Sequence, residues 1–295
     1  MQSVPEILRK IRRLELRTRR FVETAFAGQY HSVFKGRGMN FDEFRQYDFG
    51  DEVRLIDWNV TARMGEPYVR KYVEERELTV MLLIDVSASG SYGSVSASKR
   101  ELAAEVACVL AFCAAQNGDK VGLILFTDQV ELYVAPAKGR IHNLRLIREI
   151  LYFQPESRQT DLKQPLDFLN RVTTRRAVVF LLSDFHAKTY EKSLTVCSRR
   201  HDLIAVPIED RGEFALPNIG WVRVEDPETG TAYEIDSSDR RLRSTFIETA
   251  EKERSARDAL LRRKKIDSIP LRTDQDYFPT LRSFFIRREK RLRLR

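Results

Sequence analysis

The sequence predicts an α/β domain with a doubly wound, mostly parallel sheet of six strands, one of them an antiparallel edge strand. Short, continuously apolar runs recur along the chain, which is typical of strands buried on both faces. Stretches with helical spacing separate these runs, and this alternation favours a parallel sheet covered by helices on both sides. The expected strands are 78–84, 121–126, 130–134, 177–182, 203–208 and 266–272.

Helices and turns fill the intervals. The turn 127–129 leads into 130–134, which is the expected antiparallel edge strand. Residues 219–236 contain the turn sequence DPETG and indicate an inserted hairpin. The expected helices are 96–116, which stops at Asn117–Gly118, and 140–153, 161–172, 188–199, 238–264 and 277–290.

Three parts are expected along the chain. Residues 1–76 hold a basic amphipathic helix, ending near Gly28, and a segment of poor periodicity. Residues 77–291 form the α/β domain, with the hairpin inserted at about 211–237, and residues 282–295 carry a basic tail. The basic face of the first helix is either a solvated surface or a contact with a membrane or nucleic acid, and both interpretations stay open.

Composition favours a folded protein of the cytoplasm. The chain has 295 residues, of which 42% are hydrophobic, so a large core can be buried. No apolar run approaches the roughly 20 residues that cross a bilayer, and the N-terminus lacks the apolar stretch of a secretory signal. The three cysteines show no C-x-x-C spacing, which argues against a disulfide framework. Peripheral membrane contact is left open.

The net charge of +8 belongs to the two ends of the chain. Residues 1–20 hold seven bases against two acids, and residues 282–295 hold seven against one. The body between them therefore carries a slight excess of acids. This distribution disfavours a nucleic-acid-binding domain, although binding through the basic termini remains an alternative function that steep salt dependence would reveal.

Oxygen-bearing side chains follow two of the apolar runs. Asp85 ends the run 78–84 and begins the loop Asp-x-Ser-x-Ser, with Ser87 and Ser89 at alternate positions. Asp184 follows the run 177–182, and Thr160 lies in a loop before a helix. Ligands of doubly wound sheets bind at the carboxyl ends of strands, so these five side chains are expected to converge there.

The chemistry of this set favours a divalent ion. All five side chains are hard oxygen donors, which suit Mg²⁺, or alternatively Ca²⁺ or Mn²⁺, better than zinc. With only two carboxylates the ion would stay electron-poor and could accept an acidic side chain of a partner. Ordinary roles compete with this hypothesis: Thr160 is also a candidate N-cap for a helix starting at Asp161, as Asp128 is a candidate turn residue.

An enzymatic alternative is a Mg²⁺-dependent phosphoester hydrolase with Asp85 as nucleophile. Ser87 stands where a haloacid-dehalogenase-like phosphatase has a second acid, and no lysine suggests itself as a partner. The residues therefore favour a binding site over a catalytic one.

Several motifs resemble known families. Asp85-x-Ser87-x-Ser89, Thr160 and Asp184 resemble the metal-ion-dependent adhesion site of von Willebrand factor A domains. The segments GRGMNF (36–41), YDFGDEVRLIDW (47–58), TAR (61–63), VR (69–70) and EERE (74–77) resemble the signature of the bacterial family called domain of unknown function fifty-eight. DQDY (274–277), followed by Phe284–Phe285, resembles the C-terminal end of that family.

This resemblance implies a von Willebrand factor A-like sheet, a divalent ion and a bacterial cytoplasmic or membrane-proximal setting. It also implies a partnership with MoxR-type AAA+ ATPases in assembling or activating other complexes. Gln159 departs from the glycine that relatives have before the threonine, and its larger side chain is expected to crowd the loop of Thr160. The expected function is a non-enzymatic, metal-dependent adaptor that grips an acidic side chain of a partner protein.

The segment 35–77 has two interpretations. Its balanced charges suggest a salt-bridged collar around the domain, with Trp58 and the phenylalanines as a local core. Alternatively, its arginines form a docking surface for an acidic partner. The arginines concerned are Arg37, Arg54, Arg63 and Arg70.

Overall fold

The computed structural model describes residues 40–49, 51–73, 77–94 and 97–293. The expected N-terminal helix and Arg37 lie outside these residues. The core is a sheet with strand order β10-β7-β6-β3-β4-β5, in which only β5 runs antiparallel to its neighbour. The expected fold class is confirmed. The strands are β3 (Thr79–Asp85), β4 (Lys120–Phe126), β5 (Val130–Ala137), β6 (Val178–Ser183), β7 (Asp202–Glu209) and β10 (Asp267–Ser268).

The sixth expected strand is broken into two short pieces. β10 pairs with the start of β7, and β11 (Leu271–Arg272) pairs with the end of the same strand. Pro270 stands between them and has no backbone N–H to donate to a ladder. The chain therefore leaves and rejoins the edge of β7 within a few residues.

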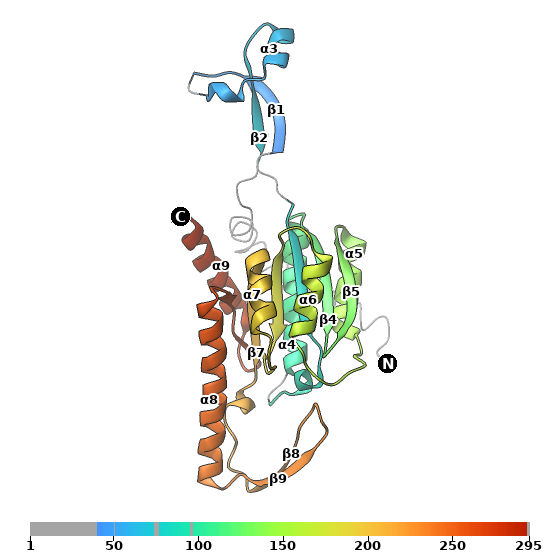
Figure 1. Cartoon of the computed structure of the whole chain (residues 1–295), viewed down its shortest axis with the longest axis vertical. Coiled ribbons are helices and arrows are strands. Elements are labelled where there is room, and N and C mark those ends of the chain that lie inside the picture. The colour runs from blue at the N-terminus through green and yellow to red at the C-terminus, as the bar shows by residue number, and fades with distance from the viewer. Residues whose placement is uncertain (1–39, 50, 74–76, 95–96, 294–295) are drawn as a thin grey trace.

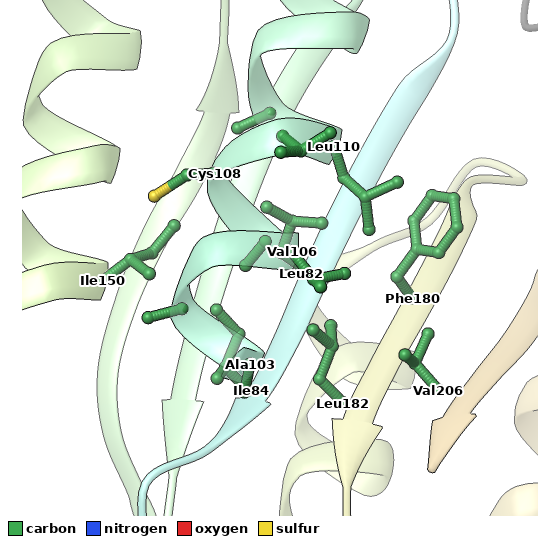
Figure 2. Packing of buried hydrophobic residues seen from close by; sticks show 14 of the residues in the cluster. Leu82, Ile84, Ala103, Val106, Cys108, Leu110, Ile150, Phe180, Leu182 and Val206 are labelled. Atoms are coloured by element: carbon green, nitrogen blue, oxygen red, sulfur yellow. The ribbon is translucent and has the colours of Figure 1, made fainter. Parts of the chain in front are cut away.

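Alternation along the central strand sorts the core into two layers, because successive side chains of a strand point to opposite faces. Leu82 and Ile84 face one layer, where Figure 2 shows them against Val106 and Leu110 of α4. Met81 belongs to the other layer. The first layer contains α4 (Lys99–Gln116), α5 (Arg140–Tyr152) and α9 (Tyr277–Arg293), and the second contains α6 (Lys163–Val172), α7 (Glu191–Arg200) and the end of α8 (Arg240–Arg263).

The C-terminal helix α9 is part of this core. Phe284 and Phe285 are buried, and the guanidinium of Arg288 contacts Asp202 and donates to Asp267 over 2.8 Å. The basic residues from 282 onward therefore include at least one that holds the helix against the sheet. In the described part of the chain, no helix has both the length and the apolarity that crossing a bilayer requires.

Two elements extend from the sheet, at opposite ends in Figure 1. The arm consists of β1 (Asn40–Gln46), the 3-10 helix η2 (Val53–Leu55), α3 (Trp58–Met64) and β2 (Tyr68–Val73), with β1 antiparallel to β2. The tip hairpin consists of β8 (Trp221–Glu225) and β9 (Ala232–Asp236), and it lies at the end of the sheet where β3 and β6 finish. The expected inserted hairpin is present.

The arm differs from one of the two sequence-based interpretations in its structure. Trp58 is 67% exposed and Phe49 is fully exposed, so the expectation that they form a local core is wrong. Asp57 caps α3, a helix that the poor periodicity did not predict, by accepting hydrogen bonds from the next turn. Arg54 and Arg63 are exposed, and Arg70 lies on β2. Docking through these arginines stays a prediction.

Candidate functional site

Asp85 lies at the carboxyl end of the central strand β3 and anchors the loop that follows it. Its Oδ1 accepts a hydrogen bond from the backbone N of Ser87 over 3.0 Å. Its Oδ2 accepts one from Ser183 Oγ, at the end of the neighbouring strand β6, over 2.7 Å. The loop then turns into the 3-10 helix η3 (Ala88–Ser91), which places Ser89 Oγ 3.1 Å from Ser87 Oγ. The structure thus brings Asp85, Ser87 and Ser89 together.

Asp184 follows β6 at the same edge but has a different partner. Lys99 Nζ donates to Asp184 Oδ2 over 2.8 Å, and the same ammonium contacts Glu213 Oε1. Asp184 Oδ1 accepts from the backbone N of His186 over 3.1 Å. The Lys99 side chain is 4% exposed, so this ion pair is shielded from solvent. One of the two predicted carboxylates therefore already has a cation from the chain itself.

Helix α4 positions that lysine. Ser98 and Glu101 form a reciprocal capping box at its N-terminus, which fixes the first turn and makes Lys99 its first residue. Although burial disfavours the ammonium, Asp184 and Glu213 raise the pKa of Lys99 above its ordinary value. Lys99 is therefore a permanent positive charge beside the two strand ends.

The two buried aspartates respond oppositely to their surroundings. Burial, together with the charge of Asp184, raises the pKa of Asp85 to about 6. Burial acts on Asp184 in the same direction, but the charge of Lys99 and the neighbouring His186 outweigh it and lower the pKa of Asp184. Within the described residues, no ion pair involves Asp85. Its carboxylate is the charge in this site that lacks a counter-charge.

A small cavity opens between these groups. Its volume is about 20 Å³, enough for one water molecule or one ion but far too small for a metabolite. Charged and polar side chains line it together with apolar ones. The polar part of its lining consists of Asp85, Ser89, Lys99, Arg100, Ser183 and Asp184.

Thr160 lies beside this cavity rather than in its lining. The backbone N of Ala88 donates to the carbonyl of Arg158 over 3.0 Å, so the Thr160 loop lies against the Asp85 loop. Thr160 Oγ1 donates to Glu228 Oε1 at the turn of the tip hairpin over 2.7 Å. The alternative role as an N-cap is wrong, because α6 begins only at Lys163 and has no side-chain cap.

The residues present fit a small, hard divalent ion at the Asp85 half of the site. Asp85, Ser87 and Ser89 offer one carboxylate and two hydroxyls, the oxygen ligands that Mg²⁺, Ca²⁺ and Mn²⁺ prefer. Among the residues that the structure describes, no three His, Cys, Asp or Glu side chains gather into a metal-binding group, so serine hydroxyls would have to complete the ligand set beside Asp85. Asp184 fits less well as a direct ligand because Lys99 neutralises it.

Sequence reasoning missed four residues of this site. Lys99 is the most important, and the expectation that no lysine suggests itself is wrong. Lys99 could have been identified because it starts the first helix after the Asp-x-Ser-x-Ser loop. Ser183 could have been identified because it directly precedes Asp184. Glu213 and Glu228 follow β7 in segments whose placement depends on the whole fold, so no local pattern identifies them.

Comparisons with known proteins identify the family of this chain. The model of the family described as "Protein of unknown function DUF58" matches residues 43–256. The uncharacterized protein Rv1480 of Mycobacterium tuberculosis and the uncharacterized protein Mb1516 of Mycobacterium bovis are each 30% identical to the chain over 289 residues, which cover 97% of this chain and 91% of each relative.

Solved structures with some similarity include two further proteins. BatB from Bacteroides thetaiotaomicron, a conserved hypothetical protein, has a TM-score of 0.44 and 12% identity, covering 72% of this chain and 99% of its own. The SpRpn10 VWA domain has a TM-score of 0.39 and 13% identity, covering 70% and 94%. The family match covers most of the chain, including the whole Asp85 site. The protein belongs to the DUF58 family, and its α/β domain is built on the mostly parallel sheet described above.

Proposed function

We propose that this protein is a non-enzymatic adaptor that binds an acidic side chain of a partner protein through a divalent ion held by Asp85, Ser87 and Ser89. Mg²⁺ is the first choice, with Ca²⁺ or Mn²⁺ as alternatives. The observation that carries the proposal is a buried carboxylate that forms no ion pair with any described residue and has two convergent hydroxyls beside it. The bound ion would supply an electron-poor position that a partner's carboxylate completes.

The surrounding residues have separate roles in this proposal. Ser183 holds Oδ2 of Asp85 in place, so the carboxylate is oriented before any ligand arrives. Lys99 neutralises Asp184, which keeps the site from carrying two unpaired negative charges. Thr160 adds a hydroxyl from the facing loop, in contact with Glu228. The chain's own residues thus orient and partly neutralise the site without offering a reaction.

Hydrolysis of a phosphoester has weaker support. The cavity beside Asp85 has a volume of about 20 Å³, so most of a phosphorylated substrate would lie outside it. Lys99 is held between Asp184 and Glu213, and it is not bonded to Asp85. The carboxylate that would act as nucleophile accepts hydrogen bonds at both of its oxygens. These features suit a fixed ligand better than an attacking group.

We further propose that the partner is a MoxR-type AAA+ ATPase or its client in the bacterial cytoplasm, as the resemblance to this family implies. The first test is calorimetry with Mg²⁺ alone on metal-stripped protein. The second is capture of a purified MoxR-type ATPase of the same organism, without nucleotide, in Mg²⁺ and in chelator. Both signals are expected in the wild type and lost in Asp85→Ala.

Asp128→Ala is the matched control for both tests. Asp128 also follows a buried strand, but it lies in the turn between β4 and β5 and accepts from Thr127 Oγ1 over 3.3 Å. This variant should bind as the wild type does. Equal capture in chelator and in Mg²⁺, or an Asp85→Ala variant that still takes up Mg²⁺, would contradict the proposal.

A further inference from the structure

We propose that Glu228 is an internal acidic ligand of this site, supplied by the tip hairpin, which occupies the position that a partner's carboxylate must take. This inference rests on the proposed function and names the regulation of the same site. Thr160, one of the predicted ligands, donates its hydroxyl to Glu228 Oε1 over 2.7 Å. A carboxylate of the chemistry expected of a partner is therefore already bound at the rim of the site.

A short series of hydrogen bonds connects Glu228 to the centre of the site. Glu228 accepts from Thr160, whose loop is bonded through the carbonyl of Arg158 to the backbone N of Ala88. Ala88 lies between Ser87 and Ser89, the two residues whose hydroxyls are predicted ligands of the ion. Figure 1 places the β8–β9 turn at the same end of the domain as the ends of β3 and β6. The hairpin tip thus meets a loop that borders the site.

The turn of the hairpin is built to present this residue. Asp226 Oδ1 accepts from the backbone N of Glu228 over 2.9 Å, and Asp226 Oδ2 accepts from Thr229 Oγ1 over 2.8 Å. Gly230 closes the turn with a φ of 72°, a conformation that glycine adopts without strain, and its N donates to the carbonyl of Asp226. The backbone of Glu228 is therefore fixed before its side chain reaches Thr160.

Outside its turn, the hairpin is largely exposed. Trp221 and Tyr233 are 74% and 59% exposed, whereas Glu228 at the turn is half-buried. An isolated two-stranded hairpin is marginally stable in water, so the contact at the tip matters for its position. At the base, Ser237 is buried and its Oγ donates to the carbonyl of Gly220. These contacts close the base of the hairpin, and Glu228 connects its tip to the Thr160 loop.

This arrangement makes the hairpin a competitor of any acidic partner. A tethered tip acts at a high effective concentration, so an external carboxylate must outcompete it. The binding of the ion and the binding of Glu228 are thermodynamically linked. If the ion strengthens the binding of Glu228, then bound Glu228 raises the affinity of the site for the ion by the same factor. A chain without that carboxylate should therefore bind the ion less well but admit external acids more easily.

Hydrogen exchange on the full-length chain, with Mg²⁺ alone as the probe, tests the first half of this inference. Saturating Mg²⁺ should slow exchange of the backbone amides of residue 226 and residues 228–231 by at least about fivefold in the wild type. Glu228→Gln should lose this protection, and calorimetry should show an affinity for Mg²⁺ that is about fivefold weaker. Glu225→Gln, an exposed acid on the same hairpin, is the matched control and should behave as the wild type.

Competition tests the second half. At saturating Mg²⁺, a pentaglutamate peptide should bind Glu228→Gln at least about fivefold more tightly than it binds the wild type or Glu225→Gln. Equal binding of the peptide, or a wild type in which Mg²⁺ leaves the tip amides unchanged or speeds their exchange, would overturn the inference. Failure of Mg²⁺ to bind the wild type at all is a separate calorimetric result and would remove the proposed function together with it.

Discussion

Two carboxylates, those of Asp85 and Asp184, lie at the same edge of one sheet, at the ends of neighbouring strands. Their hydrogen-bond partners differ. Asp184 is bonded to Lys99, which Glu213 also contacts, so its charge is balanced within the protein. Asp85 is surrounded by neutral donors, the backbone N of Ser87 and the hydroxyl of Ser183. The difference teaches that this fold neutralises one buried acid with its own lysine, while it surrounds the neighbouring acid with neutral hydrogen-bond donors.

The opposite pKa directions of the two acids express this difference. A group whose charged form is buried without a counter-charge shifts toward its neutral form, and a paired group shifts toward its charged form. The pKa of Asp85 rises to about 6, and that of Asp184 falls below its ordinary value. Lys99→Met removes the counter-charge of Asp184, and Asp85→Asn removes the charge of Asp85 itself.

Lys99→Met should have the largest effect. It leaves the buried carboxylate of Asp184 without its ammonium, and removing one partner of a buried pair costs about 3–5 kcal/mol. Urea denaturation of the variant and the wild type measures this loss. Lys188→Met, which removes an exposed lysine, is the control and should change the free energy of unfolding by less than about 0.5 kcal/mol. A loss of less than about 1 kcal/mol in Lys99→Met would show that Asp184 does not depend on Lys99.

Asp85→Asn should change the pH dependence of stability in chelator. The unfolded carboxyl titrates near its ordinary value, at about 4, and the folded one at about 6, so the folded state holds the extra proton between these values. The free energy of unfolding of the wild type therefore falls as the pH rises through this window and stays low above it. Asp85→Asn should lose the slope and gain about 2 kcal/mol at pH 7.5. Parallel pH curves for the two proteins would contradict the assignment of an unpaired carboxylate.

Ser89→Ala should have the smallest effect on folding and a selective effect on binding. Its hydroxyl contacts Ser87 Oγ and lines the cavity, so its loss should cost about 1 kcal/mol or less of stability. The affinity for Mg²⁺ should fall about tenfold, a change of about 1.4 kcal/mol. Ser91→Ala, on the same 3-10 helix but exposed, serves as the control in calorimetry. An unchanged affinity in Ser89→Ala would place the ion elsewhere.

The sheet and the Asp85 loop could be predicted from the sequence because their signals are local. A continuous apolar run such as 78–84 indicates a strand buried on both faces, and an acid at its end indicates the functional edge. Parallel pairing then brings separate strand ends together without further information. The inserted hairpin was also predictable, since a DPETG turn between two strand-like segments is a local feature.

The rest could not be predicted because it depends on contacts between distant segments. Lys99 contacts an acid 85 residues away, and Thr160 contacts one 68 residues away. No periodic pattern in the sequence indicates contacts over such separations. The helix α3 depends on the cap at Asp57, a single-residue signal inside a segment without a clear period. Trp58 is exposed although its size suggested a core, because the arm offers it no second layer to pack against.

Crystals of the metal-stripped protein, soaked in Mn²⁺ and measured for anomalous scattering, provide the most direct test of the central contrast. One Mn²⁺ peak should appear within ligand distance of Asp85, Ser87 and Ser89, while Lys99 remains bonded to Asp184. At saturating Mn²⁺, the absence of a peak beside Asp85 would contradict the account, as would an ammonium of Lys99 that has moved to Asp85 in its place.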